Sequence, residues 1–175
     1  GPMLYTFVNS FSGSASYGLF PAEWSLQGWK EVFWNRPHYL AKFWNSLGIS
    51  AAIVVGQVLL SCLAGDGFSK FRFRGKEPLF FLLILMMMMP YQVTLVSNYL
   101  MLDKLGLVGS QWSLILPAAF SPFGVFLLRQ VFDTCPNEIL EAARLDGAGN
   151  LRILFRILVP RCRAGVISLG ILSFI

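Results

Sequence analysis

Three stretches of the chain contain no charged residue, and charged connections separate them. They are Asn45–Leu63, Leu79–Val96 and Trp112–Leu128. Each stretch has about the length that crosses a ~30 Å hydrocarbon core as a helix. Apolar residues fill these stretches continuously instead of forming one stripe, which is typical of helices surrounded by lipid and protein. The pattern therefore predicts membrane spans at about residues 45–64, 78–97 and 112–129.

A fourth apolar stretch lies at the C-terminal end, at residues 164–175. At a rise of ~1.5 Å per residue a helix of this length covers roughly 18 Å, which is too short to cross the membrane. Two interpretations fit it: a re-entrant segment, or a span that the end of the chain interrupts. We favour the second interpretation.

The composition agrees with a membrane protein. Hydrophobic residues make up 55% of the chain and charged residues 13%, and the mean hydropathy is +0.62. These values exclude an ordinary soluble domain. We therefore predict an all-α polytopic transmembrane helix bundle with three complete spans and one partial span, in a single domain over residues 1–175 that is truncated at both ends.

The distribution of basic residues predicts the orientation. Arginine and lysine are concentrated between the first two predicted spans and after the third, whereas the connection between the second and third spans has only Lys104, next to Asp103. Because basic residues are enriched on the cytoplasmic side, the two basic connections are expected inside. Residues 9–44 are then extracytoplasmic, and residues 2–8 are expected to be the outer end of an upstream span. This distribution explains the net charge of +5 without nucleic acid.

The extracytoplasmic segment 9–44 is rich in aromatic residues, among them Trp24, Trp29, Trp34 and Trp44. These residues fit an aromatic belt at the membrane interface or, alternatively, a platform on which sugar rings stack. Ser25 is predicted to cap a short helix over residues 26–34.

Small residues and prolines modify the predicted spans. Gly48, Ala52 and Gly56 form a stripe that permits close helix packing. Pro90, Pro117 and Pro122 are expected to kink the second and third spans, because proline lacks a backbone N–H and leaves a carbonyl free. The polar residues that follow Pro90 fit packing or, alternatively, a substrate path; they are Gln92, Asn98 and Tyr99.

Several kinds of chemistry are missing from the sequence. The three predicted complete spans contain no Asp, Glu, Lys, Arg or His, although carriers driven by proton gradients generally need titratable groups there. The chain has no phosphate-binding G-x-x-x-x-G-K-[ST] loop. The spacing of Cys62, Cys135, Cys162 and His38 supports neither a disulfide framework nor a metal site. Energy for uphill transport would therefore have to come from another subunit.

The long inside loop, residues 130–163, is predicted to form two short helices. The first runs from Pro136 to about Leu145, with Thr134 or Cys135 as its cap, and ends at Gly147. Asn150 caps the second helix, which ends before Pro160. On this second helix Arg152 and Arg156 are expected on one face, opposite an apolar face formed by Leu151, Leu154, Phe155 and Leu158. This pattern fits a docking element for a protein better than a hairpin that rests on lipid.

The inside loop also carries a family resemblance. The run Glu141-Ala142-Ala143, then Asp146-Gly147-Ala148 and finally Ile157-Leu158-Val159-Pro160, resembles the EAA signature of permease subunits of bacterial ATP-binding-cassette importers. Further matches place the chain near carbohydrate-type permeases similar to the second maltose permease subunit; they are Leu26-Gln27-Gly28-Trp29, Trp44-Asn45-Ser46-Leu47, residues 71–76 and Pro136-Asn137-Glu138. Two stretches depart from the family pattern, residues 64–68 and Arg161-Cys162-Arg163.

The resemblance implies a six-span domain in the bacterial cell membrane. It implies a second permease subunit, ATPase subunits that bind ATP and Mg, and an extracytoplasmic solute-binding protein as partners, with membrane lipid around the spans. The chain itself would need no cofactor and would not be an enzyme. By matching position, the ATPase-docking or coupling residues would be Glu141, Ala142, Ala143, Asp146, Gly147, Ala148 and Pro160.

Our leading hypothesis is a permease subunit of a sugar importer, coupled to ATPase subunits through the EAA loop. Two alternatives stay open at this stage. The cargo is another small solute, such as a polyamine or phosphate, or the chain is a membrane anchor or sensor that does not transport.

Overall fold

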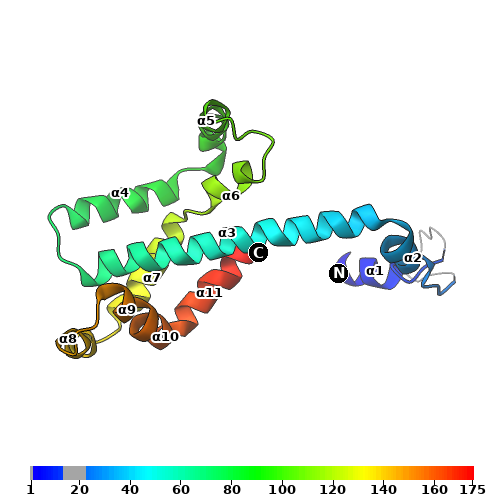
Figure 1. Cartoon of the computed structure of the whole chain (residues 1–175). Helices are drawn as coiled ribbons and strands as arrows, with labels where there is room; N and C mark the ends of the chain where they lie inside the picture. Colours follow the sequence, from blue (N-terminus) through cyan, green and yellow to red (C-terminus); the bar gives the residue numbers. More distant parts are fainter. Residues whose placement is uncertain (1, 14–22) are drawn as a thin grey trace. The chain divides into compact units, whose positions relative to one another are not determined.

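The structure, a computed structural model, describes residues 2–13 and 23–175. Part of the predicted extracytoplasmic segment 9–44, residues 14–22, lies outside the described residues. Within the described residues every regular element is a helix, which confirms the predicted all-α fold, and one isolated antiparallel bridge joins Ser12 and Trp24 (Figure 1). The elements are α1 (Pro2–Asn9), α2 (Gln27–Lys30), η1 (Glu31–Asn35), α3 (Pro37–Lys70), α4 (Lys76–Met88), α5 (Tyr91–Lys104), α6 (Trp112–Ala118), α7 (Pro122–Asp133), α8 (Asn137–Leu145), α9 (Asn150–Ile153), η2 (Leu154–Leu158), α10 (Val159–Arg161) and α11 (Arg163–Phe174).

The chain divides into two compact units, Gly1–Gly48 and Ile49–Ile175. In the first unit, aromatic side chains form a continuous ladder. Phe11 lies between Phe7 and Trp29, with ring centroids 5.4 Å and 6.0 Å apart, and Trp29 stacks on Phe33 at 5.8 Å. The Ser25 hydroxyl accepts a hydrogen bond from the Gln27 backbone N–H at 3.1 Å. The predicted short helix is therefore present as α2 and the π-helical η1. Leu26, and not Ser25, is at its N-cap position, although Ser25 accepts from its first amide.

Helix α3 contains the first predicted span and extends beyond both of its ends. Its part from His38 to Lys70 is the one single helix among the described residues that is long and apolar enough to cross a membrane. At ~1.5 Å per residue its 34 residues measure about 51 Å. This is longer than a ~30 Å hydrocarbon core, so the helix has length to spare for its polar C-terminal turn.

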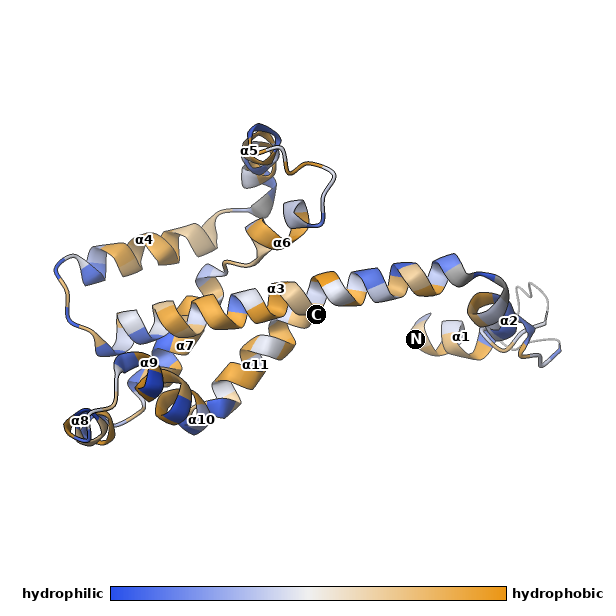
Figure 2. Cartoon of the chain, in the orientation of Figure 1, coloured by the Kyte–Doolittle hydropathy of each residue, from blue (hydrophilic) through white to orange (hydrophobic). Residues whose placement is uncertain are grey.

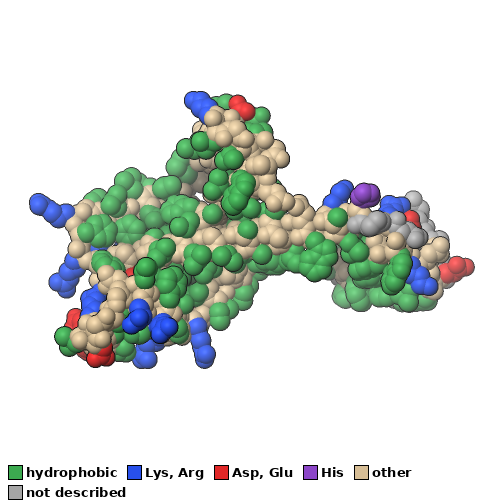
Figure 3. Space-filling model, viewed as in Figure 1, with side chains coloured by type: hydrophobic (Ala, Val, Ile, Leu, Met, Phe, Trp, Pro, Cys, Tyr) green, Lys and Arg blue, Asp and Glu red, His purple; other side chains and the backbone are tan. Residues whose placement is uncertain are grey.

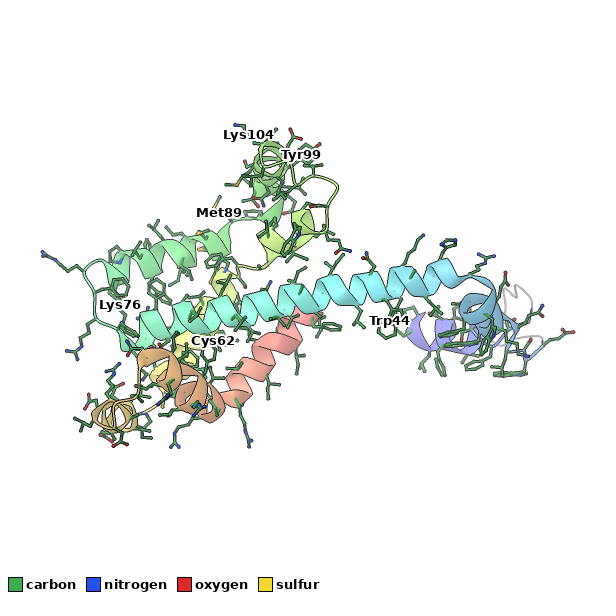
Figure 4. All side chains as sticks on the ribbon, in the orientation of Figure 1. Trp44, Cys62, Lys76, Met89, Tyr99 and Lys104 are labelled. Atoms are coloured by element: carbon green, nitrogen blue, oxygen red, sulfur yellow. The ribbon has the colours of Figure 1, made fainter. Side chains whose placement is uncertain are left out.

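The second predicted span, residues 78–97, is broken into α4 and α5, which lie at 104° to each other. Pro90 separates them, and Met89 before it is extended, with φ −74° and ψ 126°. A proline disfavours helical backbone in the preceding residue and cannot donate to the carbonyl four residues back. The predicted kink at Pro90 is thus a complete break of the helix. Met89 marks this break in Figure 4, and Tyr99 and Lys104 lie beyond it on α5.

The third predicted span is bent by 41° between α6 and α7. Pro117 lies inside α6, whereas Pro122 is the first residue of α7, so the break lies before Pro122. Pro122 has no N–H for the Ala118 carbonyl, and the Gln57 side-chain amide of α3 donates to this carbonyl at 2.6 Å. The carbonyl that the proline frees is therefore satisfied by a neighbouring helix, as membrane burial requires.

The fourth apolar stretch forms α11, which is bent by 85° from the preceding helical stretch, Asn150–Arg161. That stretch does not end before Pro160, which corrects our expectation. It widens into the π-helical turn η2, where the Val159 N–H donates to the Leu154 carbonyl five residues back. Pro160 cannot donate to the chain before it, so we attribute the wider turn to the need to continue the helix past this proline.

The core of the second unit lies where α3, α7, η2 and α11 meet, and small residues let these helices approach closely. A Cβ at Gly65 of α3 would lie 3.1 Å from the Leu128 Cβ of α7. An added Cβ at Gly56, from the predicted small-residue stripe, would also lie 3.1 Å from the Ala119 Cβ. An added Cβ at Gly48 would meet no atom within 4 Å. The buried cluster consists of Cys62, Leu128, Phe132, Cys135, Leu154, Leu158, Cys162 and Leu169. Figure 2 shows apolar colour along α4 and α11 and polar colour at α8 and at the α3–α4 connection.

Candidate functional site

The candidate coupling helix is α8, which carries Glu141, Ala142 and Ala143. Its C-terminus closes in a Schellman motif: the Ala148 N–H donates to the Ala143 carbonyl and the Gly147 N–H donates to the Arg144 carbonyl, both at 3.0 Å. Gly147 has φ +80°, a backbone conformation that glycine adopts without steric cost. The predicted end of this helix at Gly147 is confirmed.

The N-terminus of α8 differs from our prediction. Pro136 lies just before the helix and not at its first position, and no side chain caps the first turn. The Thr134 hydroxyl, one of the two expected caps, donates instead to the Val131 carbonyl of α7 at 2.7 Å. Lys70, the last residue of α3, does not cap these amides, because an ammonium group only donates, but it ties the start of α8 to α3. Its ammonium group donates to the Cys135 carbonyl at 2.7 Å and to Asn137 Oδ1 at 3.0 Å.

One face of α8 is anchored and the other is open. Leu140 is 3% exposed and anchors the helix, and Ala143 is half-buried on the same side. Ala142 is exposed, and Leu145 is 89% exposed. A Cβ added at Gly147 would meet no atom within 4 Å. The predicted docking residues therefore do not share one face of α8. Ala142 and Gly147 face outward, whereas Ala143 faces the protein.

The N-cap of the second short helix of the inside loop lies one residue earlier than predicted. Gly149 is the N-cap residue and Asn150 is the first residue of α9. No side chain caps this helix. The buried residues of this stretch are Ile153, Leu154 and Leu158, whereas Leu151 and Phe155 are 64% and 42% exposed. The expected apolar face was thus wrong for Leu151 and Phe155. Phe155 lies in the π-helical turn, which changes the rotation per residue, whereas Leu151 lies before this turn, between the exposed Asn150 and Arg152. Arg152, Arg156 and Pro160 are exposed. Figure 3 shows several basic side chains on the surface near this part of the molecule.

Side chains from four helices meet beside α8 in what we call the polar junction, which consists of Ser69, Lys70, Glu77, Arg129, Asp133 and Asn137. The Ser69 hydroxyl donates to Asp133 at 2.6 Å. The Arg129 guanidinium lies 3.4 Å from Glu77 and 3.8 Å from Asp133, and it covers the Phe80 ring at 3.7 Å. Arg129 is only 15% exposed, whereas Glu77 and Asp133 are 74% and 45% exposed, so solvent still screens these pairs.

The sequence contained little signal for the polar junction. Its basic residues were interpreted as determinants of orientation. Arg129 and Asp133 are four positions apart, but the other pairs join residues 52 to 67 positions apart. Such long-range pairs do not follow from local pattern. A hollow of about 520 Å³ lies beside the junction and α8; it is lined by Lys70, Phe71, Arg72, Asn137, Leu140, Glu141, Arg144 and Asn150.

The predicted substrate-path residues all lie on α5, but the structure brings only two of them together. Asn98 and Tyr99 line a mainly apolar hollow of about 630 Å³ between α4–α5 and α6–α7, and Gln92 is exposed outside it. Thr94 and Ser113 also line this hollow and were not anticipated. Thr94 and Asn98 are four residues apart on one helix face, a spacing that the sequence contained. Within the described residues no group of His, Cys, Asp and Glu is arranged to hold a metal ion.

Comparison with known proteins identifies the class. Residues 57–175 match the family described as "Binding-protein-dependent transport system inner membrane component", and the chain therefore belongs to this family. It is a multi-pass inner-membrane protein. Residues 2–13 and 23–175 contain one helix long enough to span, and up to four spans if each bent helix pair counts as one.

Several named proteins are similar to the chain. It is 34% identical, over 91% of its length and 59% of the other, to "Maltodextrin transport system permease protein MdxG" of Bacillus subtilis. It is 29% identical, over 99% of its length and 66% of the other, to "sn-glycerol-3-phosphate transport system permease protein UgpE" of Brucella abortus. It is 36% identical to "Probable ABC transporter permease protein YurM" of Bacillus subtilis, over 98% of its length and 59% of the other. The chain thus spans about three fifths of the length of these relatives.

A solved structure shares the fold. The chain superposes with a TM-score of 0.87 and 21% identity on a chain in "Crystal structure of a bacterial ABC transporter involved in the import of the acidic polysaccharide alginate". The match covers 99% of this chain and 62% of the other. The resemblance to carbohydrate-type permeases of ATP-binding-cassette transporters is confirmed.

Proposed function

We propose that the chain forms part of the translocation path of a binding-protein-dependent ATP-binding-cassette importer and receives the motion of ATPase subunits through α8. The observation that carries this proposal is the construction of α8. The helix is anchored by Leu140 and Lys70 on one side, ends in a fixed glycine turn, and has an open outer face. The docking residues in this proposal are Glu141, Ala142, Ala143, Asp146, Gly147, Ala148 and Pro160.

ATP and Mg are held by the separate ATPase subunits in this proposal, since the chain carries no phosphate-binding glycine loop. A second permease subunit and an extracytoplasmic solute-binding protein complete the transporter. ATP drives the change of state only through the difference in its binding free energy between the two states. Movement of the ATPase at α8 then passes into α3 and α7 through the polar junction.

The cargo is a sugar-type solute. Two of the relatives above are named for the transport of maltodextrin and of sn-glycerol-3-phosphate. A further relative, from Halalkalibacterium halodurans, is named for the transport of arabinooligosaccharides. Asn98 and Tyr99 contribute to the path, since their amide and hydroxyl groups suit a hydroxyl-rich solute and line the 630 Å³ hollow. Gln92 has less support, because it does not line that hollow.

A test of docking compares the full-length protein with its Gly147→Arg variant. Arginine at this position strains the positive-φ turn and places a bulky cation on the open face of α8. We expect the wild type to co-purify with its ATPase subunit and the variant to lose it, together with uptake of labelled maltotriose, arabinotriose or sn-glycerol-3-phosphate into membrane vesicles.

The matched control is Gly109→Arg. Gly109 also has positive φ, +85°, and also has no atom within 4 Å of an added Cβ, but it lies in the connection between α5 and α6. This variant carries the same strain and the same added charge, and it should keep the ATPase. Retention of the ATPase and of uptake by Gly147→Arg would refute the docking role of α8.

A further inference from the structure

Helix α8 is attached to α3 at its N-terminal end. There the Lys70 ammonium bridges the Cys135 carbonyl, just before the helix, and the Asn137 side chain in its first turn. The Lys70 bridge therefore holds the first turn of α8 against the last turn of α3.

The Lys70 contact differs from an ordinary surface contact. The ammonium donates two charge-assisted hydrogen bonds, and one acceptor is the carbonyl of Cys135, a residue that is 5% exposed within the main core cluster. Charge-assisted bonds are shorter and stronger than neutral ones. A second lysine, Lys76, binds the same end of α3, because its ammonium lies 3.3 Å from the carbonyls of Ser69 and Phe71. The bonds of Lys76 join α3 to its own connection and do not involve α8.

We propose that Lys70 is a positioning residue that fixes the start of α8 to the cytoplasmic end of α3, so that the two helices move as one body. The inference rests on the proposed coupling function of α8. It makes α3 the element to which movement of the docked ATPase passes directly. The role of Lys70 is exerted through Asn137 and the Cys135 carbonyl, and Lys70 need not touch the ATPase or the solute.

The test uses the full-length protein assembled with its ATPase and partner subunits in liposomes. After ATP hydrolysis and phosphate release, vanadate takes the place of the phosphate and traps ADP on the ATPase. Hydrogen exchange then reports the nucleotide-dependent change in the connection between α5 and α6, residues 105–111, far from α8 in the sequence. In Lys70→Met the lysine stem is kept and the ammonium is lost. We expect assembly and vanadate trapping at wild-type levels, while the exchange response falls about tenfold, as loss of charge-assisted bonds predicts.

Two variants give the matched controls. Lys76→Met removes the same charge from the same end of α3 and should keep the full response. Lys70→Arg can donate to both acceptors and should restore it. Asn137→Ala should weaken the response, and its effect should not add to that of Lys70→Met, because the two residues share one bond.

The outcomes separate the two proposals. A wild-type response in Lys70→Met, or an equal loss in Lys70→Met and Lys76→Met, would overturn the positioning role while the docking function stands. Failure of the wild-type protein to assemble with the ATPase would overturn the docking function and this inference with it. A merely structural role would lower the yield of assembled protein without changing the response per assembled complex.

Discussion

The polar junction and the α5–α6 part of the second unit are built in different ways. In the polar junction, Lys70, Ser69 and Arg129 form bonds that connect helices far apart in the sequence. In residues 91–118, the Ser110 and Ser113 hydroxyls donate to carbonyls three residues back. Apolar side chains such as Met101 and Leu114 are 65% and 58% exposed there. Bonds between helices hold the first region together, whereas the second region presents an apolar surface for lipid or another subunit to cover.

The largest expected effect is on stability in the core beneath the polar junction. Phe132 is fully buried, and truncation to alanine should lower the free energy of unfolding by about 3–5 kcal/mol. Leu100 of α5 is 54% exposed, and its truncation should cost less than about 1 kcal/mol. Thermal unfolding of the purified protein in detergent measures both. Equal losses in the two variants would remove the contrast between the regions.

An intermediate effect is expected at the point where the regions join. Gln57→Leu leaves the Ala118 carbonyl, freed by Pro122, without its donor, and an unsatisfied buried group costs about 1–3 kcal/mol. The same unfolding measurement applies. Gln92→Leu is the control, because Gln92 is exposed and should change stability little. A neutral Gln57→Leu variant would show that water or lipid headgroups satisfy this carbonyl.

The smallest effect on stability is expected within the α5–α6 hollow, where function should respond instead. Asn98→Ala should change the free energy of unfolding by no more than about 0.5 kcal/mol. Uptake of a solute that bonds to the amide should fall about fivefold, the equivalent of one hydrogen bond. Gln92→Ala should leave uptake intact. The assignment of the path fails if the two alanine variants transport equally well.

Local features of this molecule could be predicted from the sequence, and long-range ones could not. The end of α8 followed from Gly147, since every bond of its closing motif lies within six consecutive residues. The breaks at Pro90 and Pro122 followed from the missing N–H. The donor that satisfies the freed carbonyl, Gln57, is 61 positions away and left no trace in the pattern.

The errors at the inside loop have the same origin. Caps were assigned to Thr134 and Asn150 from residue preference, but Thr134 closes the helix before it and Lys70 holds the start of α8 from another element. The apolar face of the second helix was expected to contain Leu151 and Phe155. The π-helical turn η2 invalidates a regular helical projection at Phe155, and Leu151 is exposed in the α-helical stretch before it. The roles of Glu141 to Pro160 in docking, and of Asn98 and Tyr99 in transport, stay predictions.

The turn η2 has a consequence for how this segment can vary among natural variants. A π-helical turn contains one residue more than the α-helical turn that it replaces. Loss of one residue between Leu154 and Leu158 would rotate everything that follows by about 100°. Gly165 of α11, which needs its small size because an added Cβ would lie 2.7 Å from Val131, would then turn away and a larger residue would take its place. Selection is therefore expected to act more strictly on the number of residues between Gly149 and Gly165 than on the identity of exposed ones such as Leu151.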